Sequence, residues 1–235
     1  AGLPVVKHGN RSYTSRCGSA DVLERCGVRI DAPPETMRAA LDATGVAFLY
    51  APLYHPGLRH AAGARKTLGV RTMMNVLGPC LNPASPPVQL LGVADPSLLE
   101  PVARTLAALG VARALIVHGG GLDEIALHST TQAIRLENGE IETLVISPED
   151  AGLERRSRDP LRGGDPEENA RRLRALLEGA GAAAESEIVA LNAGALLPLA
   201  GRAPSLREAV ALAADALRAG LPAEVLSSFV EASNA

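Results

Sequence analysis

The sequence predicts an α/β fold with a mixed, largely parallel central sheet flanked by helices. Short apolar runs alternate with amphipathic stretches along the 235 residues, and the last third consists of helical patterns. Hydrophobic residues make up 47% of the chain and charged residues 21%, a composition typical of folded globular proteins. The length is sufficient for a substantial hydrophobic core, so we expect a packed globular body.

Three buried strands are predicted at 45–50, 88–93 and 112–119, because each is a short apolar run next to glycine. We expect these three strands to form the interior of the sheet. Between the second and the third, residues 96–110 carry apolar side chains at helical spacing and end at Gly110. A helix that returns the chain in this way implies a parallel pair of strands.

An antiparallel hairpin and two capped helices complete the predicted elements. Asn138-Gly139 separates two segments of alternating polarity, which is the strongest short-range signal for a hairpin and makes the sheet mixed. Residues 165–168 place an Asp, a Pro and a Glu before an amphipathic stretch, as at the start of a helix. Ser205 and Glu208 repeat the capping pattern, so we expect helices in the last third to pack on the sheet.

The composition disfavours several classes of partner. The formal net charge is −3 and aromatic residues are only 2% of the chain, so neither a basic surface nor a base-stacking platform for nucleic acid is expected. No apolar run reaches the length of a membrane span, and we expect no membrane partner. The three cysteines lack C-x-x-C spacing, which favours reduced thiols and a cytoplasmic location.

The first twenty residues have the composition of a phosphate-binding loop. Gly9 and Gly18 let backbone N–H groups approach an anion, while Lys7, one of only two lysines, and nearby arginines supply positive charge. A helix beginning near Ser19 would add its dipole. The alternative is a polar turn capped by Ser19, and Asp21 favours it because an acid in the first helical turn competes with an anion.

Two further groups of residues point to chemistry. Asp123 and Glu124 are adjacent carboxylates in a Gly-rich turn after a predicted strand, where hard cations such as Mg²⁺ bind; the alternative is an exposed acidic turn. Arg65 has the fork geometry to pair with a carboxylate, or it lies on an ordinary charged helix surface. No histidine spacing predicts a zinc site, and no motif predicts a covalent nucleophile.

Three segments together resemble the anthranilate phosphoribosyltransferase family of the nucleoside phosphorylase-like phosphoribosyltransferases. They are VVKHGNRSYTSRCGSADVLERCGV at 5–28, FLYAPLYHPGLRHAAGARKTLGVRTMMNVLGPCLNPA at 48–84 and GLDEIALHS at 121–129. The resemblance implies a phosphoribosyltransferase-like α/β domain that transfers the phosphoribosyl group of phosphoribosyl pyrophosphate to the amine of anthranilate and releases pyrophosphate. It also implies Mg²⁺ as cofactor, a role in tryptophan biosynthesis and a homodimer.

The resemblance assigns site residues by position. No residue is expected to be catalytic in itself, because anthranilate is an aromatic amine that is neutral at pH 7 and needs no strong base, so positioning and electrostatics suffice. The residues implied for phosphoribosyl pyrophosphate are Lys7, His8, Gly9, Asn10, Arg11, Ser12, Tyr13, Thr14, Ser15 and Ser19. Those implied for anthranilate are Asn10, Ala51, Pro52, His55 and Arg65, and those for Mg²⁺ are Asp123 and Glu124.

The sequence also departs from the family pattern. The family normally begins with a helical domain and a G-T-G-G-D loop, and neither lies within residues 1–235, so we expect these residues to form the C-terminal phosphoribosyltransferase α/β domain. Alternatives are a pyrimidine-nucleoside phosphorylase-like enzyme, a non-catalytic relative that binds nucleic acid, and a folded domain that binds substrate weakly without catalysis. Asn10 with Arg65 favours an anthranilate carboxylate over the first, and the net charge disfavours the second.

Overall fold

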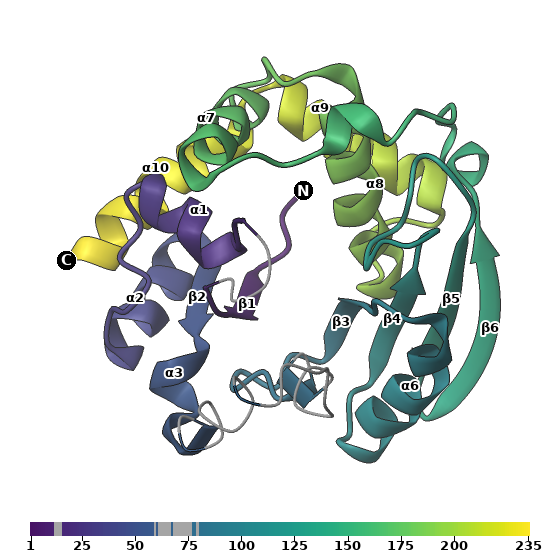
Figure 1. Cartoon of the computed structure of the whole chain (residues 1–235), viewed down its shortest axis with the longest axis horizontal. Coiled ribbons are helices and arrows are strands. Elements are labelled where there is room, and N and C mark those ends of the chain that lie inside the picture. Colours follow the sequence, from purple (N-terminus) through teal and green to yellow (C-terminus); the bar gives the residue numbers. More distant parts are fainter. Residues whose placement is uncertain (12–15, 59, 61–66, 68–76, 79) are drawn as a thin grey trace. The chain divides into compact units, whose positions relative to one another are not determined.

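A computed structural model describes residues 1–11, 16–58, 60, 67, 77–78 and 80–235 (Figure 1). The chain divides into two compact units. Unit 1 consists of Ala1, Pro86–Arg162 and Ala175–Leu221, and unit 2 consists of Gly2–Ser85, Gly163–Arg174 and Pro222–Ala235. Within the described part of the chain, no helix has the length and apolar character needed to cross a bilayer.

Unit 2 is built on a parallel pair of short strands. β1 (Val5–Gly9) pairs with β2 (Val46–Tyr50), in a register that sets Gly9 opposite Tyr50. The helix α2 (Pro34–Thr44) precedes β2 and ends at Gly45, whose φ of 74° is a conformation that glycine adopts at little cost. The Gly45 carbonyl accepts a hydrogen bond from the Val5 N–H at 2.8 Å, which aligns the two strands.

The core of unit 2 contains both phenylalanines of the chain. Phe48 on β2 and Phe229 on α10 (Leu221–Asn234) are almost fully buried, in one cluster with Ile30 and Met37. Burial of such side chains contributes roughly 1.5–3 kcal/mol each, so this cluster holds the strands against the helices. The remaining helical segments of the unit's first part are α1 (Ser19–Arg25), α3 (Ala51–Tyr54) and the 3-10 turn η1 (Pro56–Leu58).

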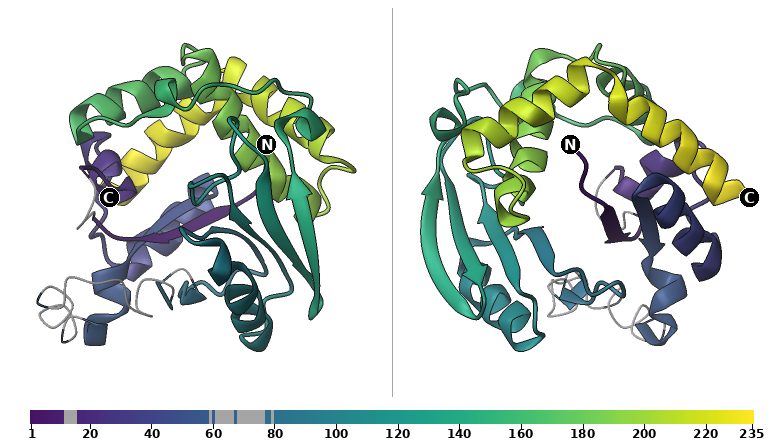
Figure 2. Two further views of the ribbon diagram at one scale, coloured as in Figure 1. Left: turned by 45° about the vertical axis from the view of Figure 1, so that its right-hand side comes forward. Right: turned by 180° about the vertical axis from the view of Figure 1, so that it is seen from behind.

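Unit 1 contains a four-stranded sheet in the order β3-β4-β5-β6. Its strands are β3 (Val88–Gly92), β4 (Arg113–His118), β5 (Thr131–Glu137) and β6 (Glu140–Ile146). The 3-10 turn η2 (Pro96–Leu98) and α6 (Leu99–Ala108) connect the parallel strands β3 and β4. β5 and β6 form the long antiparallel hairpin that is visible in Figure 2.

Three helices follow the sheet, α7 (Pro166–Leu177), α8 (Ala183–Leu199) and α9 (Leu206–Arg218), and side chains cap the first and the third. The Asp165 carboxylate accepts the Glu168 N–H at 2.8 Å, and the Ser205 hydroxyl accepts the Glu208 N–H at 3.3 Å, as expected. α8 packs closely on α9 because Gly194 carries no Cβ, which would lie 2.8 Å from Val210. The 3-10 turns η3 (Pro148–Ala151) and η4 (Asp159–Leu161) precede these helices.

The structure confirms the mixed α/β class, with helices flanking a sheet, as well as the strand–helix–strand crossover and the hairpin. Asn138 and Gly139 both have positive φ, as a two-residue hairpin turn requires. The expected sheet composition is wrong in two respects. The strand at 46–50 pairs with residues 5–9 in a separate sheet, and the four-stranded sheet has one parallel and two antiparallel pairs, so it is not largely parallel. Residues 5–9 and 46–50 are far apart in the chain and are not joined by a hairpin turn, so no local sequence signal indicates that they pair.

Candidate functional site

The carboxyl ends of β1 and β2 bring two groups of predicted site residues to one edge of unit 2. β1 ends at Gly9, opposite the last residue of β2, and the chain continues into Asn10 and Arg11. β2 leads directly into α3, which begins with Ala51 and Pro52. In parallel sheets, this edge is where ligands gather. Gly9, implied for phosphoribosyl pyrophosphate, therefore lies next to the start of the Ala51–Tyr54 segment implied for anthranilate.

His8 on β1 and His55 after α3 are in contact beside this edge. Their rings meet edge to face, with centroids 5.0 Å apart. His8 Nδ1 lies 3.2 Å from the Gly78 carbonyl oxygen and His55 Nε2 lies 3.0 Å from the Leu81 carbonyl oxygen, so these nitrogens carry the protons. Nε2 of His8 is buried without a hydrogen-bond partner among the described residues.

Burial keeps the His8 ring neutral. Desolvation lowers the pKa of His8 below its ordinary value of 6.5, and proximity to His55 lowers it further, although the hydrogen bond to Gly78 opposes the shift. A neutral imidazole in this position offers one hydrogen-bond acceptor and no positive charge. His8 therefore adds no positive charge at this edge.

Arg11 is already engaged by other side chains. Its guanidinium donates to both Glu24 carboxylate oxygens, at 3.0 and 2.6 Å, and to the Tyr50 hydroxyl at 2.5 Å. It also lies 5.0 Å above the Tyr50 ring, and the Glu24 hydrogen bond raises the pKa of Arg11. Arg11 thus ties the segment after β1 to α1 and to the end of β2. The sequence pattern did not point to this role of Glu24, which lies among ordinary helix charges.

The start of α1 is capped by its own acid. The Asp21 carboxylate accepts a hydrogen bond from the Gly18 N–H at 2.7 Å, as the polar-turn alternative anticipates. Ser19 nevertheless lies close to β1, because a Cβ on Gly9 would meet its hydroxyl at 3.5 Å and the Phe48 ring at 3.1 Å. Lys7 is exposed on β1. The remaining residues expected at this site, Ser12, Tyr13, Thr14, Ser15 and Arg65, lie outside the described residues.

Unit 1 carries the predicted carboxylates on what we call the carboxylate turn, residues 119–125. Gly119 and Leu122 exchange backbone hydrogen bonds at 2.8 and 3.1 Å, and the two residues between them are glycines with φ of 55° and 89°. Positive φ at both central positions defines a type I′ turn, which explains the run of glycines. Asp123 and Glu124 follow with exposed side chains.

The carboxylate turn fits a magnesium ion that shares its coordination with a substrate. Two exposed carboxylates supply hard oxygen ligands, and Mg²⁺ in phosphate sites is typically held by one or two carboxylates together with phosphate oxygens. Among the described residues, no group of three or more His, Cys, Asp or Glu side chains forms a metal cluster. A closed all-protein cage is therefore not part of the described structure, whereas a shared site is compatible with it.

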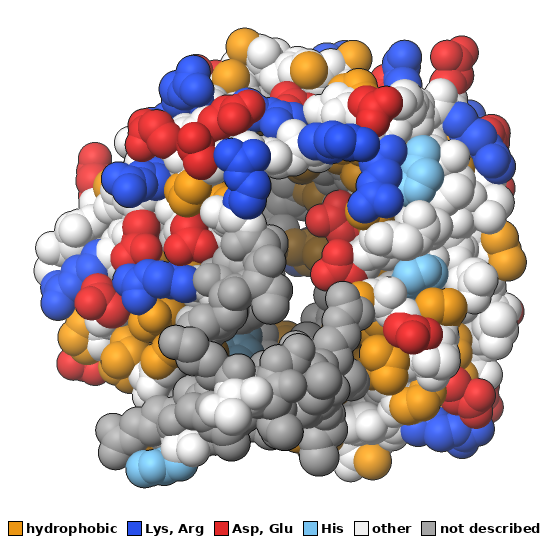
Figure 3. All heavy atoms as spheres, in the orientation of Figure 1, with side chains coloured by type: hydrophobic (Ala, Val, Ile, Leu, Met, Phe, Trp, Pro, Cys, Tyr) orange, Lys and Arg blue, Asp and Glu red, His pale blue; other side chains and the backbone are white. Residues whose placement is uncertain are grey.

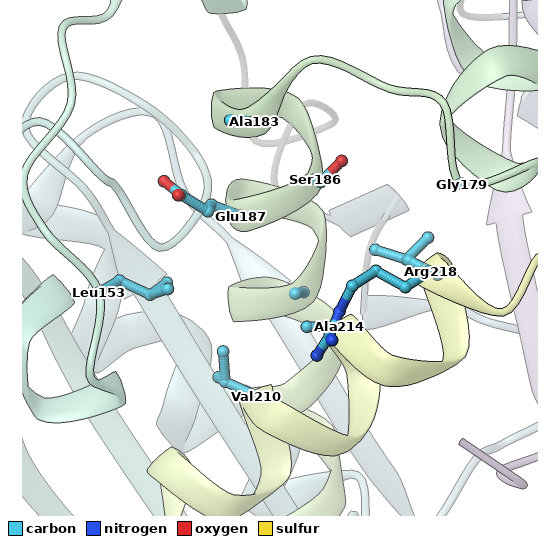
Figure 4. A pocket seen from close by; sticks show the side chains of 10 residues that line it. Leu153, Gly179, Ala183, Ser186, Glu187, Val210, Ala214 and Arg218 are labelled. Carbon is cyan, nitrogen blue, oxygen red and sulfur yellow. The ribbon is translucent and has the colours of Figure 1, made fainter.

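A cavity of about 260 Å³ lies elsewhere in unit 1, between α8, α9 and Leu153 (Figure 4). It is lined by Val210, Ala214 and other small or apolar side chains, and also by Glu187 and Arg218. Both charged groups are paired, Glu187 with Arg156 at 2.7 Å and Arg218 with Asp215. None of the predicted site residues that the structure describes lines this cavity.

On the face that Figure 3 displays, acidic and basic side chains are interspersed.

Comparison with known families matches residues 1–223 to a family model described as "Glycosyl transferase family, a/b domain". The chain therefore belongs to this glycosyl transferase family. Within it, the similarity is to anthranilate phosphoribosyltransferases, which confirms the resemblance seen in the sequence.

The enzyme of that name from Sorangium cellulosum is 56% identical over 230 residues, which are 98% of this chain and 66% of that protein. The chain thus spans slightly less than two thirds of this curated relative. The crystal structure of the enzyme from Thermus thermophilus is 44% identical, with a TM-score of 0.92 over 100% of this chain and 70% of that one. An anthranilate phosphoribosyltransferase from Saccharomyces cerevisiae, solved in complex with PRPP (phosphoribosyl pyrophosphate) and Mg, is 28% identical, with a TM-score of 0.89. The match covers 99% of this chain and 66% of that one.

Proposed function

We propose that this chain serves phosphoribosyl transfer from phosphoribosyl pyrophosphate to the amine of anthranilate, with release of pyrophosphate. The observation that carries the proposal is the parallel pairing of β1 with β2, which brings Lys7–Arg11 and Ala51–His55 to one edge. The similarity to anthranilate phosphoribosyltransferases supports the same reaction. A cytoplasmic location, a homodimer and a role in tryptophan biosynthesis belong to the proposal as well.

The donor is held by the segment that follows β1. Lys7 supplies a compact positive charge for a phosphate group, and Gly9 and Asn10 offer backbone N–H groups and an amide without a bulky side chain between them. Ser12, Tyr13, Thr14, Ser15 and Ser19 add hydroxyl and backbone donors in this proposal. Arg11 belongs to the same segment, and through its ion pair with Glu24 it holds that segment in place in this proposal.

The acceptor is held by the segment that follows β2. Arg65 pairs with the anthranilate carboxylate, and Asn10 bonds to the same molecule from the side of the donor. Ala51, Pro52 and His55 line its path. The His8 ring packs edge to face on the His55 ring beside this path and supports it in this proposal.

The reaction needs little more than placement. The C1–O bond to pyrophosphate breaks with its electron pair moving to the leaving oxygen, the amine nitrogen bonds to C1, and the amine releases a proton to water. Because the nucleophile is neutral at pH 7, holding the two substrates together accounts for a large part of the acceleration. When bound, Mg²⁺ supplies positive charge that stabilises the leaving pyrophosphate. Asp123 and Glu124 are the residues that would hold it.

A direct assay follows the loss of anthranilate fluorescence when the chain is mixed with phosphoribosyl pyrophosphate and Mg²⁺. We expect a decrease that requires all three components and that slows at least about tenfold in Lys7→Gln, because that variant loses a charge-assisted contact to a phosphate. Parallel reactions contain a pyrimidine nucleoside and inorganic phosphate. Release of the free pyrimidine, with no consumption of anthranilate, would replace the proposal by the phosphorylase alternative.

A further inference from the structure

The backbone of the carboxylate turn is held in place on both sides of its two acids. A Cβ on Gly92, at the end of β3, would lie 1.6 Å from the Asp123 carbonyl oxygen. A Cβ on Gly119, after the end of β4, would lie 2.2 Å from the Glu124 carbonyl oxygen. The two peptide groups that follow the acids therefore rest directly on the ends of neighbouring strands, in space that only glycine leaves free.

A side chain from α8 completes this support. The Asn192 Oδ1 atom accepts a hydrogen bond from the Ile125 N–H at 2.8 Å, and Nδ2 donates to the Ile125 carbonyl at 2.9 Å. Nδ2 also donates to the Ile188 carbonyl at 3.0 Å, one helical turn earlier. With Nδ2 facing two carbonyl oxygens and Oδ1 facing an N–H, only one orientation of the amide is compatible with the contacts.

The next residue of the chain is held in the same way. The Ala126 N–H donates to the hydroxyl of Thr131 at 2.9 Å, and Thr131 is fully buried at the start of β5. The two backbone N–H groups that follow Glu124 thus both donate to side chains and not to the backbone of a neighbouring strand. Because both acids have exposed side chains, the direction in which their carboxylates project depends on this fixed backbone.

We propose that Asn192 is a positioning residue for the magnesium-binding carboxylates: its amide fixes the peptide bond between Glu124 and Ile125. The inference rests on the proposed function, in which Asp123 and Glu124 hold Mg²⁺. Asn192 lies in α8, within a largely apolar stretch, and touches no substrate in this proposal. Replacing a residue that orients the ligands of a metal without touching the metal itself typically weakens metal binding by about 10–100-fold.

The experiment measures binding of Mn²⁺, as a spectroscopic substitute for Mg²⁺, by electron paramagnetic resonance in the presence of phosphoribosyl pyrophosphate. Asn192→Asp keeps the shape of the side chain but places a carboxylate oxygen against two carbonyl oxygens. Asn192→Ala removes the amide. Backbone amide hydrogen exchange at Ile125 and Ala126 reports on the turn without any ligand.

Asn169 offers a matched control. Its amide accepts from the Gly164 N–H at 2.8 Å and donates to the Gly164 carbonyl at 3.2 Å, so it makes the same two-point contact with a backbone in unit 2. Asn169→Asp and Asn169→Ala should lower thermal stability comparably to the Asn192 variants. They should leave Mn²⁺ binding and the exchange of Ile125 unchanged.

We expect both Asn192 variants to weaken Mn²⁺ binding at least about tenfold and to speed the exchange of the Ile125 amide, while binding of the pyrophosphate substrate without metal stays within about twofold. Unchanged Mn²⁺ binding in Asn192→Asp would overturn the inference while leaving the proposed function intact. Equally weakened Mn²⁺ binding in the Asn169 variants would overturn it too, because the weaker binding would then follow from a general loss of stability. Absence of Mn²⁺-dependent binding in the unmodified chain would overturn the proposed function itself.

Discussion

At the scale of single residues, Arg11 and His8 show how local chemistry limits what each site residue does. Both follow from the K-H-G-N-R segment, and both were expected to contact phosphoribosyl pyrophosphate. The structure gives Arg11 a bidentate acidic partner and leaves His8 neutral. These surroundings could not be predicted from the segment, because Glu24 and Gly78 are distant in sequence and carry no motif.

Replacing either member of the Arg11–Glu24 pair should have the same effect. Arg11→Gln and Glu24→Gln each free the segment after β1, so each should weaken binding of phosphoribosyl pyrophosphate by about two- to fivefold, the range expected for a half-exposed ion pair. The double variant should be no weaker than the single ones. Titration calorimetry on the four proteins makes the comparison. Weaker binding of phosphoribosyl pyrophosphate in Arg11→Gln, with unchanged binding in Glu24→Gln, would show that the guanidinium contacts the substrate directly.

His8 should make the stability of the chain depend on pH. The folded pKa lies below the unfolded value of 6.5, so the unfolded chain takes up a proton first as the pH falls. The stability that neutral His8 contributes is complete above pH 6.5 and is lost as the pH drops through that value toward the lowered folded pKa.

Urea unfolding of the unmodified chain and of His8→Asn between about pH 8 and pH 5 tests this linkage. Asn retains an N–H donor for the Gly78 carbonyl and does not titrate. We expect the unmodified chain to lose stability relative to the variant below about pH 6.5. A difference between the two proteins that stays constant across the range would show that His8 is not responsible.

At the scale of elements, the carboxylate turn depends on glycines at the ends of β3 and β4. Gly92→Ala places a methyl group against the Asp123 carbonyl, so the strand end or the turn must move. We expect a loss of about 1–3 kcal/mol in the free energy of unfolding, typical of overpacking, together with at least about tenfold weaker Mn²⁺ binding. Urea unfolding and electron paramagnetic resonance measure the two effects.

Gly139→Ala in the β5–β6 hairpin provides the comparison within the same unit. Its φ is 90° and an added Cβ there has nothing within 4 Å among the described residues, so only backbone strain of about 1–2 kcal/mol is expected. Mn²⁺ binding should be retained. If both variants lost Mn²⁺ binding equally, the close approach of Gly92 to Asp123 would have no special importance.

Elements with local signals were predictable from the sequence, whereas pairing between distant segments was not. The Asn138-Gly139 turn and the caps at Asp165 and Ser205 depend on residues a few positions apart, and all three are present. The assignment of 46–50 to a sheet with residues 5–9 depends on contacts between segments that are far apart in the chain. The β1 sequence VVKHG ends in two polar residues and a glycine, so it lacks the apolar or alternating pattern of a strand.

At the scale of the whole molecule, the chain divides into two compact units, each with its own group of predicted functional residues. Unit 2 carries the segments that we propose for phosphoribosyl pyrophosphate and anthranilate, and unit 1 carries the carboxylates that we propose for Mg²⁺. Motifs identified these residues, since each motif is continuous in sequence. The contact of Asn192 with the backbone of Ile125 could not be predicted from the sequence, because a single Asn in an apolar helix can have many roles. The family of the chain follows from its match over residues 1–223.

The most direct test of the account is a calorimetric titration of phosphoribosyl pyrophosphate into the chain, with and without Mg²⁺, compared with the same titrations of an Asp123→Asn, Glu124→Gln double variant. We predict that Mg²⁺ strengthens binding to the unmodified chain at least about tenfold, or about 1.4 kcal/mol, and that this enhancement disappears in the double variant. An equal enhancement in both proteins would contradict the assignment of the metal site. Absence of binding to the unmodified chain under all conditions would contradict the proposed function.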